Sequence, residues 1–263
     1  MDIQNLIQTV LIYALPVLFA ITVHEAAHGY AARHYGDNTA YMLGRITLNP
    51  FKHIVEALRA VAADDRLRSE VTITIDSVEH VRWLRDNLGA AARGLGVALD
   101  VDASLRVGPV HLGVRRSPTR TPAQALAVVR AALGVGLDVR GVMTYDAQVA
   151  GLPDAGPHLR ALKRRSVPEI ADRRRAVVEA LRAETDVRFV NAGGTGSLHR
   201  FAGDPVVTEL AAGSGLYAPT LFDAYDDFSP RPAMAFALPV VRRPAPGFAT
   251  AFGGGYVASG EPG

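Results

Sequence analysis

The chain contains no cysteine, which excludes disulfide bonds and thiolate metal ligands within it. Lysine is also scarce: Lys52 and Lys163 are its two occurrences, so positive charge comes almost entirely from arginine. The formal net charge of +2 is too small to indicate nucleic acid or an acidic partner. With 49% apolar and 21% charged residues, the composition is globular rather than disordered. At 263 residues, the chain can form one large domain or two ordinary ones.

The composition changes abruptly near Ile54. Residues 1–54 hold six isoleucines and three basic residues, whereas the following 209 residues hold three isoleucines and nearly all the arginines. Such a break is typical of a membrane segment followed by a soluble domain. It is equally typical of two genes of different base composition joined together. We therefore treat residues 1–54 and residues 55–263 as separate pieces.

Leu6 to Val23 is an 18-residue stretch without a charged side chain. A membrane span needs about 20 mostly apolar residues, so this stretch predicts an N-terminal transmembrane helix, with residues 5–23 in contact with lipid. A signal peptide is disfavoured because the basic start and the small-residue cleavage site are absent. The alternative is a buried helix of a soluble protein. No later stretch of the sequence is long and apolar enough for a second span, and residues 55–263 are expected in the cytoplasm.

The apolar stretch leads directly into the motif His24-Glu25-Ala26-Ala27-His28. On a helix, His24 and His28 lie on one face, where both imidazoles can reach one zinc ion. Glu25 is placed to take a proton from a zinc-bound water. The pattern alone is moderately specific, but its position favours function because ionisable residues at the end of a membrane helix are costly. We therefore predict zinc ligands at His24 and His28 and a catalytic base at Glu25.

The stretch HEAAHGYAARHYGDNTAYMLGRITLNPFKHI closely resembles the opening of the bacterial site-2 proteases, the intramembrane zinc metalloproteases of peptidase family M50. The resemblance covers essentially residues 1–54 and implies the same ligands and base. Members of that family take a third ligand, an aspartate, from a later membrane helix that this sequence lacks. Asp154, in the segment Pro153–Gly156, resembles the NP…DG-type motif that carries this aspartate, and we interpret the resemblance as a coincidence.

From Val55 onward, short apolar runs alternate with helical stretches rich in arginine and alanine. The runs predicted as strands are Val71–Ile75, Val97–Val101, Leu137–Thr144, Val187–Asn191 and Val206–Leu210. The predicted helices include His80–Arg93, Pro122–Leu133 and Pro168–Glu184. This alternation predicts right-handed βαβ units and an α/β fold with a parallel sheet or barrel. In such a fold, chemistry is expected at the carboxyl ends of the strands.

Two glycine-rich turns directly follow predicted strands. Residues 191–197 read NAGGTGS, and residues 212–217 read AGSGLY. Exposed backbone N–H groups can converge on a phosphate in such turns, and no side chain blocks its approach. Each turn alone is more simply explained as an ordinary tight connection. Two turns on successive strands leave a phosphate site and plain connections as equal alternatives. We expect the two turns, Gly193–Ser197 and Gly213–Leu216, to lie side by side at the carboxyl ends of their strands.

The order of these features resembles the barrel domain of the alanine racemase-like, fold-type III pyridoxal-phosphate enzymes, above all the D-threonine aldolase and amino acid deaminase/aldolase branch. The resemblance covers roughly residues 55–263 and rests on a D…R strand end, GVMTY, GGTGS, GSGLY and a terminal GGGYVASG. It implies an incomplete TIM-type (β/α) barrel that binds pyridoxal phosphate and a small amino acid substrate. By position, Arg106 matches an arginine near the cofactor ring oxygen, and Tyr145 matches an aromatic residue near the cofactor. The phosphate turns correspond to Gly193, Gly194, Thr195 and Gly196, and to Ser214, Gly215 and Leu216.

The departures from this family concern its catalytic lysine. Its members hold the cofactor as a Schiff base of a lysine on the first barrel strand. Lys52 belongs to the protease-like stretch, and Lys163 is expected on the solvated face of an arginine-rich helix. The family's first two strands and its C-terminal β-domain have no counterpart in residues 55–263. The resemblance therefore implies pyridoxal phosphate bound weakly and without a covalent bond.

Three interpretations stay open. By mass, the chain is a fragment of a pyridoxal-phosphate lyase or deaminase for D-amino or hydroxy-amino acids, expected to be inactive without the lysine. By its sharpest motif, it is a fragment of an intramembrane zinc endopeptidase. The third interpretation is a non-catalytic product of a gene fusion or of sequence assembly. The oligomeric state has no signature in the sequence.

Overall fold

The computed structural model describes residue 27 and residues 30–31, 33–36, 50–233 and 237–252. The chain divides into two compact units. Unit 1 comprises the residues up to Thr72 together with residues 82–96 and 135–138, and unit 2 comprises the remainder. The predicted transmembrane stretch and the residues His24, Glu25 and His28 lie outside the described residues. Within the described part, no helix is long and apolar enough to cross a bilayer.

The described part of unit 1 is mainly helical. Helix α3 (Pro50–Ala63) is followed by α4 (Asp65–Glu70), and the short helix η1 (Gly89–Ala92) packs against α3. Asp64 caps α4, because its carboxylate accepts hydrogen bonds from two backbone N–H groups of the first turn at 2.9 and 3.0 Å.

Unit 2 contains a five-stranded sheet. The first residues of three of its strands, Thr72, Gly96 and Asp138, are assigned to unit 1. The strand order is β1-β2-β5-β6-β7, and β6 is parallel to both of its neighbours. The bounds are β1 (Thr72–Ile75), β2 (Gly96–Asp100), β5 (Asp138–Thr144), β6 (Phe189–Ala192) and β7 (Glu209–Leu210). Each strand overlaps a run predicted from the sequence, and the predicted α/β class is confirmed. Among the described residues, β1 lies at one edge of the sheet, and no strand from the described part of residues 1–54 extends the sheet beyond it.

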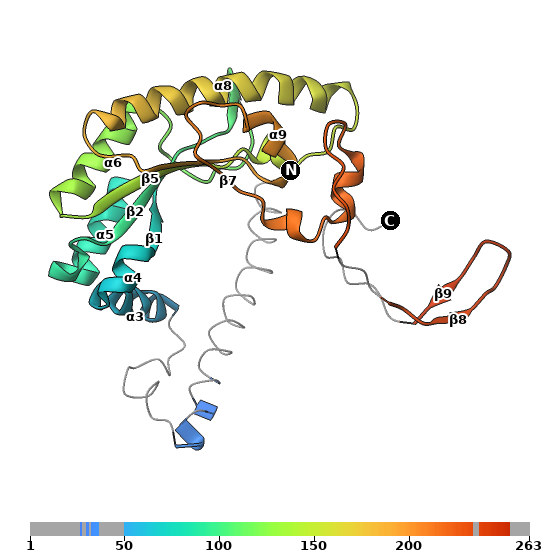
Figure 1. Cartoon of the computed structure of the whole chain (residues 1–263), viewed down its shortest axis with the longest axis horizontal. Helices are drawn as coiled ribbons and strands as arrows, with labels where there is room; N and C mark the ends of the chain where they lie inside the picture. The colour runs from blue at the N-terminus through green and yellow to red at the C-terminus, as the bar shows by residue number, and fades with distance from the viewer. Residues whose placement is uncertain (1–26, 28–29, 32, 37–49, 234–236, 253–263) are drawn as a thin grey trace. The chain divides into compact units, whose positions relative to one another are not determined.

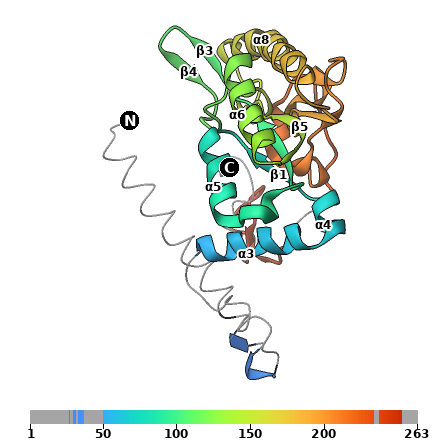
Figure 2. The same cartoon turned by 90° about the vertical axis from the view of Figure 1, so that its left-hand side faces the viewer.

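Helices connect the successive strands. Helix α5 (Val78–Leu88) follows β1, α6 (Pro122–Gly134) precedes β5, and α8 (Pro157–Arg182) joins β5 to β6. Helices α6 and α8 run side by side (Figures 1 and 2). Both bury residues spaced three and four apart, which lie on one face of a helix: Ala125, Val128, Val129 and Ala132 from α6, and Ile170, Val177, Val178 and Leu181 from α8.

Helix α8 contains most of the predicted helical stretch Pro168–Glu184 but starts earlier, at Pro157. Proline is favoured in the first helical turn. In the structure, Pro157 occupies the first turn, after Gly156 with a φ of +89°, and Pro168 lies inside the helix. Lys163 lies within α8, as expected, but on the buried face of the helix.

Short elements surround the carboxyl ends of the strands. After β5 comes α7 (Ala147–Ala150), after β6 come η2 (Thr195–Ser197) and α9 (Leu198–Phe201), and after β7 come η3 (Gly213–Leu216) and η4 (Thr220–Ala224). Two antiparallel hairpins complete the described chain: β3 (Leu105–Val107) with β4 (Val110–Leu112), and β8 (Val240–Arg242) with β9 (Thr250–Ala251).

Candidate functional site

The two glycine-rich turns lie side by side at the carboxyl ends of β6 and β7. Ser214 Oγ donates a hydrogen bond to Thr195 Oγ1 at 2.8 Å, and the backbone N–H of Gly215 donates to the same oxygen at 2.9 Å. Within the first turn, Ser197 Oγ accepts from the N–H of Gly194 at 3.0 Å and donates to its carbonyl at 3.2 Å. The predicted proximity of the two turns is therefore confirmed.

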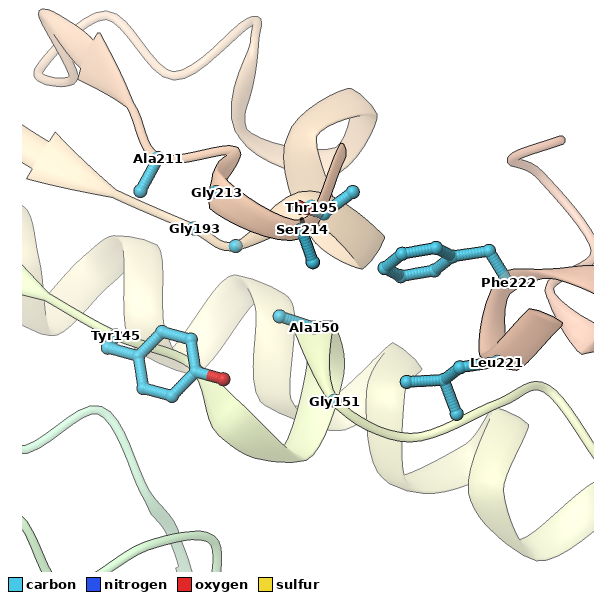
Figure 3. A pocket seen from close by; sticks show the side chains of 11 residues that line it. Tyr145, Ala150, Gly151, Gly193, Thr195, Ala211, Gly213, Ser214, Leu221 and Phe222 are labelled. Carbon is cyan, nitrogen blue, oxygen red and sulfur yellow. Dashed lines mark hydrogen bonds between the residues drawn. The ribbon is translucent and has the colours of Figure 1, made fainter. Parts of the chain in front are cut away.

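A cavity of ≈ 290 Å³ opens between these turns and α7. Figure 3 shows Tyr145 and Ala150 on one side of it, the two turns on the other, and Leu221 and Phe222 at one end. The remaining lining residues are Gly151, Gly193, Gly194, Thr195, Ala211, Gly213 and Ser214. The described lining thus consists of backbone, small side chains, hydroxyls and three larger side chains, without a lysine or an arginine.

The glycines of the turns serve different purposes. A Cβ on Gly194 would lie 2.8 Å from Ala150 Cβ, and one on Gly196 would overlap the Ala150 carbonyl oxygen, so both allow the first turn to pack on α7. Gly193 has a φ of +78°, a left-handed conformation that favours glycine. A Cβ on Gly213 would meet no atom within 4 Å. Gly213 therefore leaves open space beside the cavity.

Most positions predicted to contact a cofactor lie at this cavity. Those that line it are Tyr145, Gly193, Gly194, Thr195 and Ser214. Gly196, Gly215 and Leu216 belong to the same turns without lining the cavity, and the side chain of Leu216 is largely exposed. Their predicted contacts with a cofactor stay predictions.

Arg106 is not brought to the cavity. It lies on β3, half exposed, with its guanidinium 3.0 Å from Asp102 Oδ2. The arginine beside Tyr145 is instead Arg116, whose Cζ lies 5.8 Å from the centre of the Tyr145 ring. Asp100, at the end of β2, holds Arg116 through a 2.7 Å ion pair. Burial raises the pKa of Asp100 although Arg116 opposes the shift.

Arg116 was not predicted from the sequence, although a signal for it was present. Asp100 ends a strand whose residues are all buried, and a buried carboxylate needs a cationic partner. Arg115 and Arg116 follow the hairpin after that strand and were available for the pairing. Sequence spacing does not say which arginine returns to the strand end, because the β3–β4 hairpin intervenes.

Lys163 is buried, and our expectation of a solvated position for it was wrong. Its side chain is 1% exposed, with Nζ 3.0 Å from Asp154 Oδ1 and 4.2 Å from the centre of the Tyr225 ring. Burial lowers the pKa of Lys163 against the opposing effect of Asp154. Although burial acts in the other direction, the N–H of Asp226 and the ammonium of Lys163 hold the pKa of Asp154 below its ordinary value. Asp154 is thus the partner of Lys163 in a buried ion pair.

No group of three or more residues able to hold a metal ion occurs in the described part of the chain. The predicted zinc ligands His24 and His28 and the base Glu25 fall outside that part. The side chain of Lys52 is likewise outside the description.

Solved structures with this fold include D-threonine aldolase from Filomicrobium marinum. The two proteins are 20% identical, with a TM-score of 0.52, over 73% of this chain and 48% of that chain. Alanine racemase from Clostridium difficile 630 is 14% identical, with a TM-score of 0.42, over 80% of this chain and 50% of that chain. This chain therefore spans about half the length of these solved proteins.

A separate similarity concerns a short stretch. Over 40 residues the chain is 48% identical to a Bacillus subtilis (strain 168) protein described as "Putative zinc metalloprotease YwhC". The match covers 15% of this chain and 18% of that protein. It agrees with the protease-like resemblance of the first 54 residues.

Residues 19–220 match the family described as alanine racemase, N-terminal domain. The match begins inside the segment that we assigned to the protease-like piece, and the division at Ile54 stays a prediction. Because the matched range covers most of the chain and agrees with the α/β fold, this protein belongs to the alanine racemase N-terminal domain family.

Proposed function

We propose that unit 2 binds pyridoxal phosphate non-covalently through its two glycine-rich turns and forms no Schiff base with it. The observation that carries this proposal is the cavity between the turns, bordered by Tyr145, in a chain whose one fully described lysine is buried elsewhere in an ion pair.

The residues at the cavity fit the phosphate end of the cofactor. Backbone N–H groups of glycine-rich turns after parallel strands bind phosphate well. The Thr195 hydroxyl adds a donor, because its oxygen accepts from Ser214 and Gly215 while its own hydrogen is available, and Gly213 leaves the approach open. Tyr145 would contact the pyridine ring, and Arg116 beside it would supply a positive charge.

The described residues do not fit the covalent attachment of the cofactor. Lys163 does not line the cavity, and its ammonium is held by Asp154. When bound through a lysine, pyridoxal phosphate supplies an electron sink for carbanion chemistry. We therefore propose that this chain alone holds and orients the cofactor but does not perform the aldolase or deaminase reaction on D-amino or hydroxy-amino acids.

A pair of glycine variants tests the binding proposal. Gly213 and Gly203 both have an ordinary backbone conformation and open space around an added Cβ, but of the two only Gly213 lines the cavity. In equilibrium dialysis with pyridoxal phosphate, Gly213→Val should weaken binding by about tenfold, equivalent to about 1.4 kcal/mol. Gly203→Val should bind like the wild type. Equal affinity for pyridoxal without its phosphate, or no saturable binding, would contradict the proposal.

A second candidate function rests on the metalloprotease similarity. In it, His24 and His28 hold zinc, Glu25 activates a water, and residues 5–23 anchor the protein in a membrane, with the barrel-like part in the cytoplasm. Metal analysis of the purified protein and of the His24→Ala/His28→Ala variant tests it. Stoichiometric zinc that the variant loses would support this function, and equal trace metal in both proteins would refute it.

The third candidate, a non-catalytic fusion of two fragments, rests on the composition break near Ile54. One uninterrupted genomic read across the codons for residues 45–65 would exclude an assembly origin. Two separate loci would support it.

A further inference from the structure

Asp146 is a buried carboxyl group next in sequence to Tyr145, which lines the cavity of the proposed phosphate site. It follows Tyr145 at the end of β5, and its backbone carbonyl accepts hydrogen bonds from the N–H groups of Val149 and Ala150 at 2.8 and 2.9 Å. It therefore begins the short helix whose last residue, Ala150, lines the cavity. Its side chain is 0% exposed, and neither carboxyl oxygen has a hydrogen-bond partner of good geometry among the described residues.

The charges around Asp146 do not balance when it is ionised. Two cations from α8 act on it, Arg174 and Lys163. Each already has its own carboxylate: Arg174 Nη1 lies 2.6 Å from Asp204 Oδ2, and Lys163 Nζ lies 3.0 Å from Asp154 Oδ1. Asp146 is therefore the one of these three carboxyls that has no ion-pair partner of its own.

Asp146 is the carboxyl of this group that burial favours in its protonated form. Burial raises the pKa of Asp146 to about 7, although the Ser197 hydroxyl, Arg174 and Lys163 oppose the shift. Tyr225, the other titratable group near it, has a pKa raised to about 12 by burial and stays neutral. On α9, burial lowers the pKa of His199, so that side chain is mostly uncharged above pH 6.5.

Asp146 is connected to the first phosphate turn by the packing of α7. This helix begins at Asp146 and packs against η2, and Ser197 of η2 bonds both the N–H and the carbonyl of Gly194, which lines the cavity. An anion on this turn adds negative charge close to a carboxyl that has no solvent to screen it.

We propose that Asp146 is a proton switch for the phosphate turns, so that a dianion of the phosphate type binds there together with one proton on Asp146. This inference rests on the proposed phosphate site and adds its regulation: the site releases its anion as the pH rises from 6 to 8.5. The ligand chemistry is a tetrahedral dianion, and the phosphate group of pyridoxal phosphate is one such group.

Sulfate is the probe, because it stays a dianion across this pH range whereas phosphate esters titrate near pH 6. A pH dependence of sulfate binding therefore reports a proton bound by the protein and not one bound by the ligand. We expect calorimetric titration with sulfate to show affinity about tenfold or more weaker at pH 8.5 than at pH 6.0, since one linked proton changes affinity by at most tenfold per pH unit. Asp146→Asn should bind equally at both values, with the affinity that the wild type shows at pH 6.0. Asp186→Asn, a change at an exposed carboxylate, should keep the wild-type dependence.

The outcomes distinguish this inference from the binding proposal. Sulfate affinity that is flat with pH, or an Asp146→Asn variant that keeps the slope, overturns the switch and leaves pyridoxal phosphate binding intact. Pyridoxal phosphate binding without sulfate binding at pH 6.0 also overturns the switch. Absence of binding by either ligand at every pH overturns both proposals. If the variant does not fold, carboxyl-carbon NMR of the wild type decides, because saturating sulfate should raise the pKa of Asp146 and an unchanged pKa refutes the coupling.

Discussion

Replacing Lys163 by methionine should destabilise the protein strongly, because Asp154 would then be left as a buried charge without its cation. Both side chains are almost fully buried, at 1% and 3% exposed. Removing one partner of a buried ion pair typically costs about 3–5 kcal/mol, whereas replacing both partners is often nearly neutral. Asp154 keeps its hydrogen bond from the N–H of Asp226 at 3.0 Å, so we expect a loss near the lower end, about 3 kcal/mol.

Urea unfolding at pH 7 measures this loss, and Lys163→Met/Asp154→Asn is the matched control. The double variant should lie within about 1 kcal/mol of the wild type, because the asparagine still accepts from Asp226 and no charge is left unpaired. The pKa of native Asp154 is lowered, so its ionised form stabilises the fold above pH 3.8, and this contribution disappears as the pH falls through the native pKa. The deficit of the single variant should therefore shrink in acid. A single variant as stable as the wild type at pH 7 would refute the structural role of Lys163.

Three further predictions concern other parts of the site. The native pKa of Asp146 is raised from 3.8 to about 7, so the native state holds a proton that the unfolded state has lost between these two pH values. The free energy of unfolding should therefore fall by about 1.4 kcal/mol per pH unit from pH 3.8 to pH 7 and level off above pH 7, which thermal unfolding at a series of pH values measures. Asp146→Asn should abolish this slope, and a slope that persists would assign it to another group. Gly196→Ala should lower the free energy of unfolding by about 2 kcal/mol or more, because the added Cβ would overlap the Ala150 carbonyl. Gly203→Ala, where an added Cβ meets open space, should lower it by less than about 1 kcal/mol in the same urea assay. Arg116→Ala should weaken pyridoxal phosphate binding by about fivefold at low salt and by less at high salt, and an unchanged affinity would place Arg116 outside the site.

The elements that the sequence predicted well are those with a strong local pattern. All five strands of the sheet overlap apolar runs. The pattern is strongest in β2 and β5, because strands buried in a parallel sheet need continuous apolar side chains. The two glycine turns were predicted as neighbours because the carboxyl ends of adjacent parallel strands meet at one edge.

Long-range pairing explains what the sequence did not reveal. Lys163 lies among arginines, and a run of basic residues predicts a solvated helix face. Its burial depends on the ion pair with Asp154 and the contact with the Tyr225 ring, which form only when the helix packs in the fold. The start of α8 was misplaced because a proline inside a helix is rare. Arg106 lies within the β3–β4 hairpin and Arg116 follows it, and only the fold shows which of them reaches Tyr145.

The central claim is that the chain binds pyridoxal phosphate without a Schiff base, and one measurement tests it directly. The protein is saturated with pyridoxal phosphate, reduced with borohydride, digested and analysed by mass spectrometry, in parallel with equilibrium dialysis of an unreduced sample. We predict saturable binding in dialysis and no stoichiometric pyridoxyl adduct on Lys163 or Lys52 after reduction. A stoichiometric adduct mapped to either lysine would contradict the claim and identify a covalent cofactor enzyme.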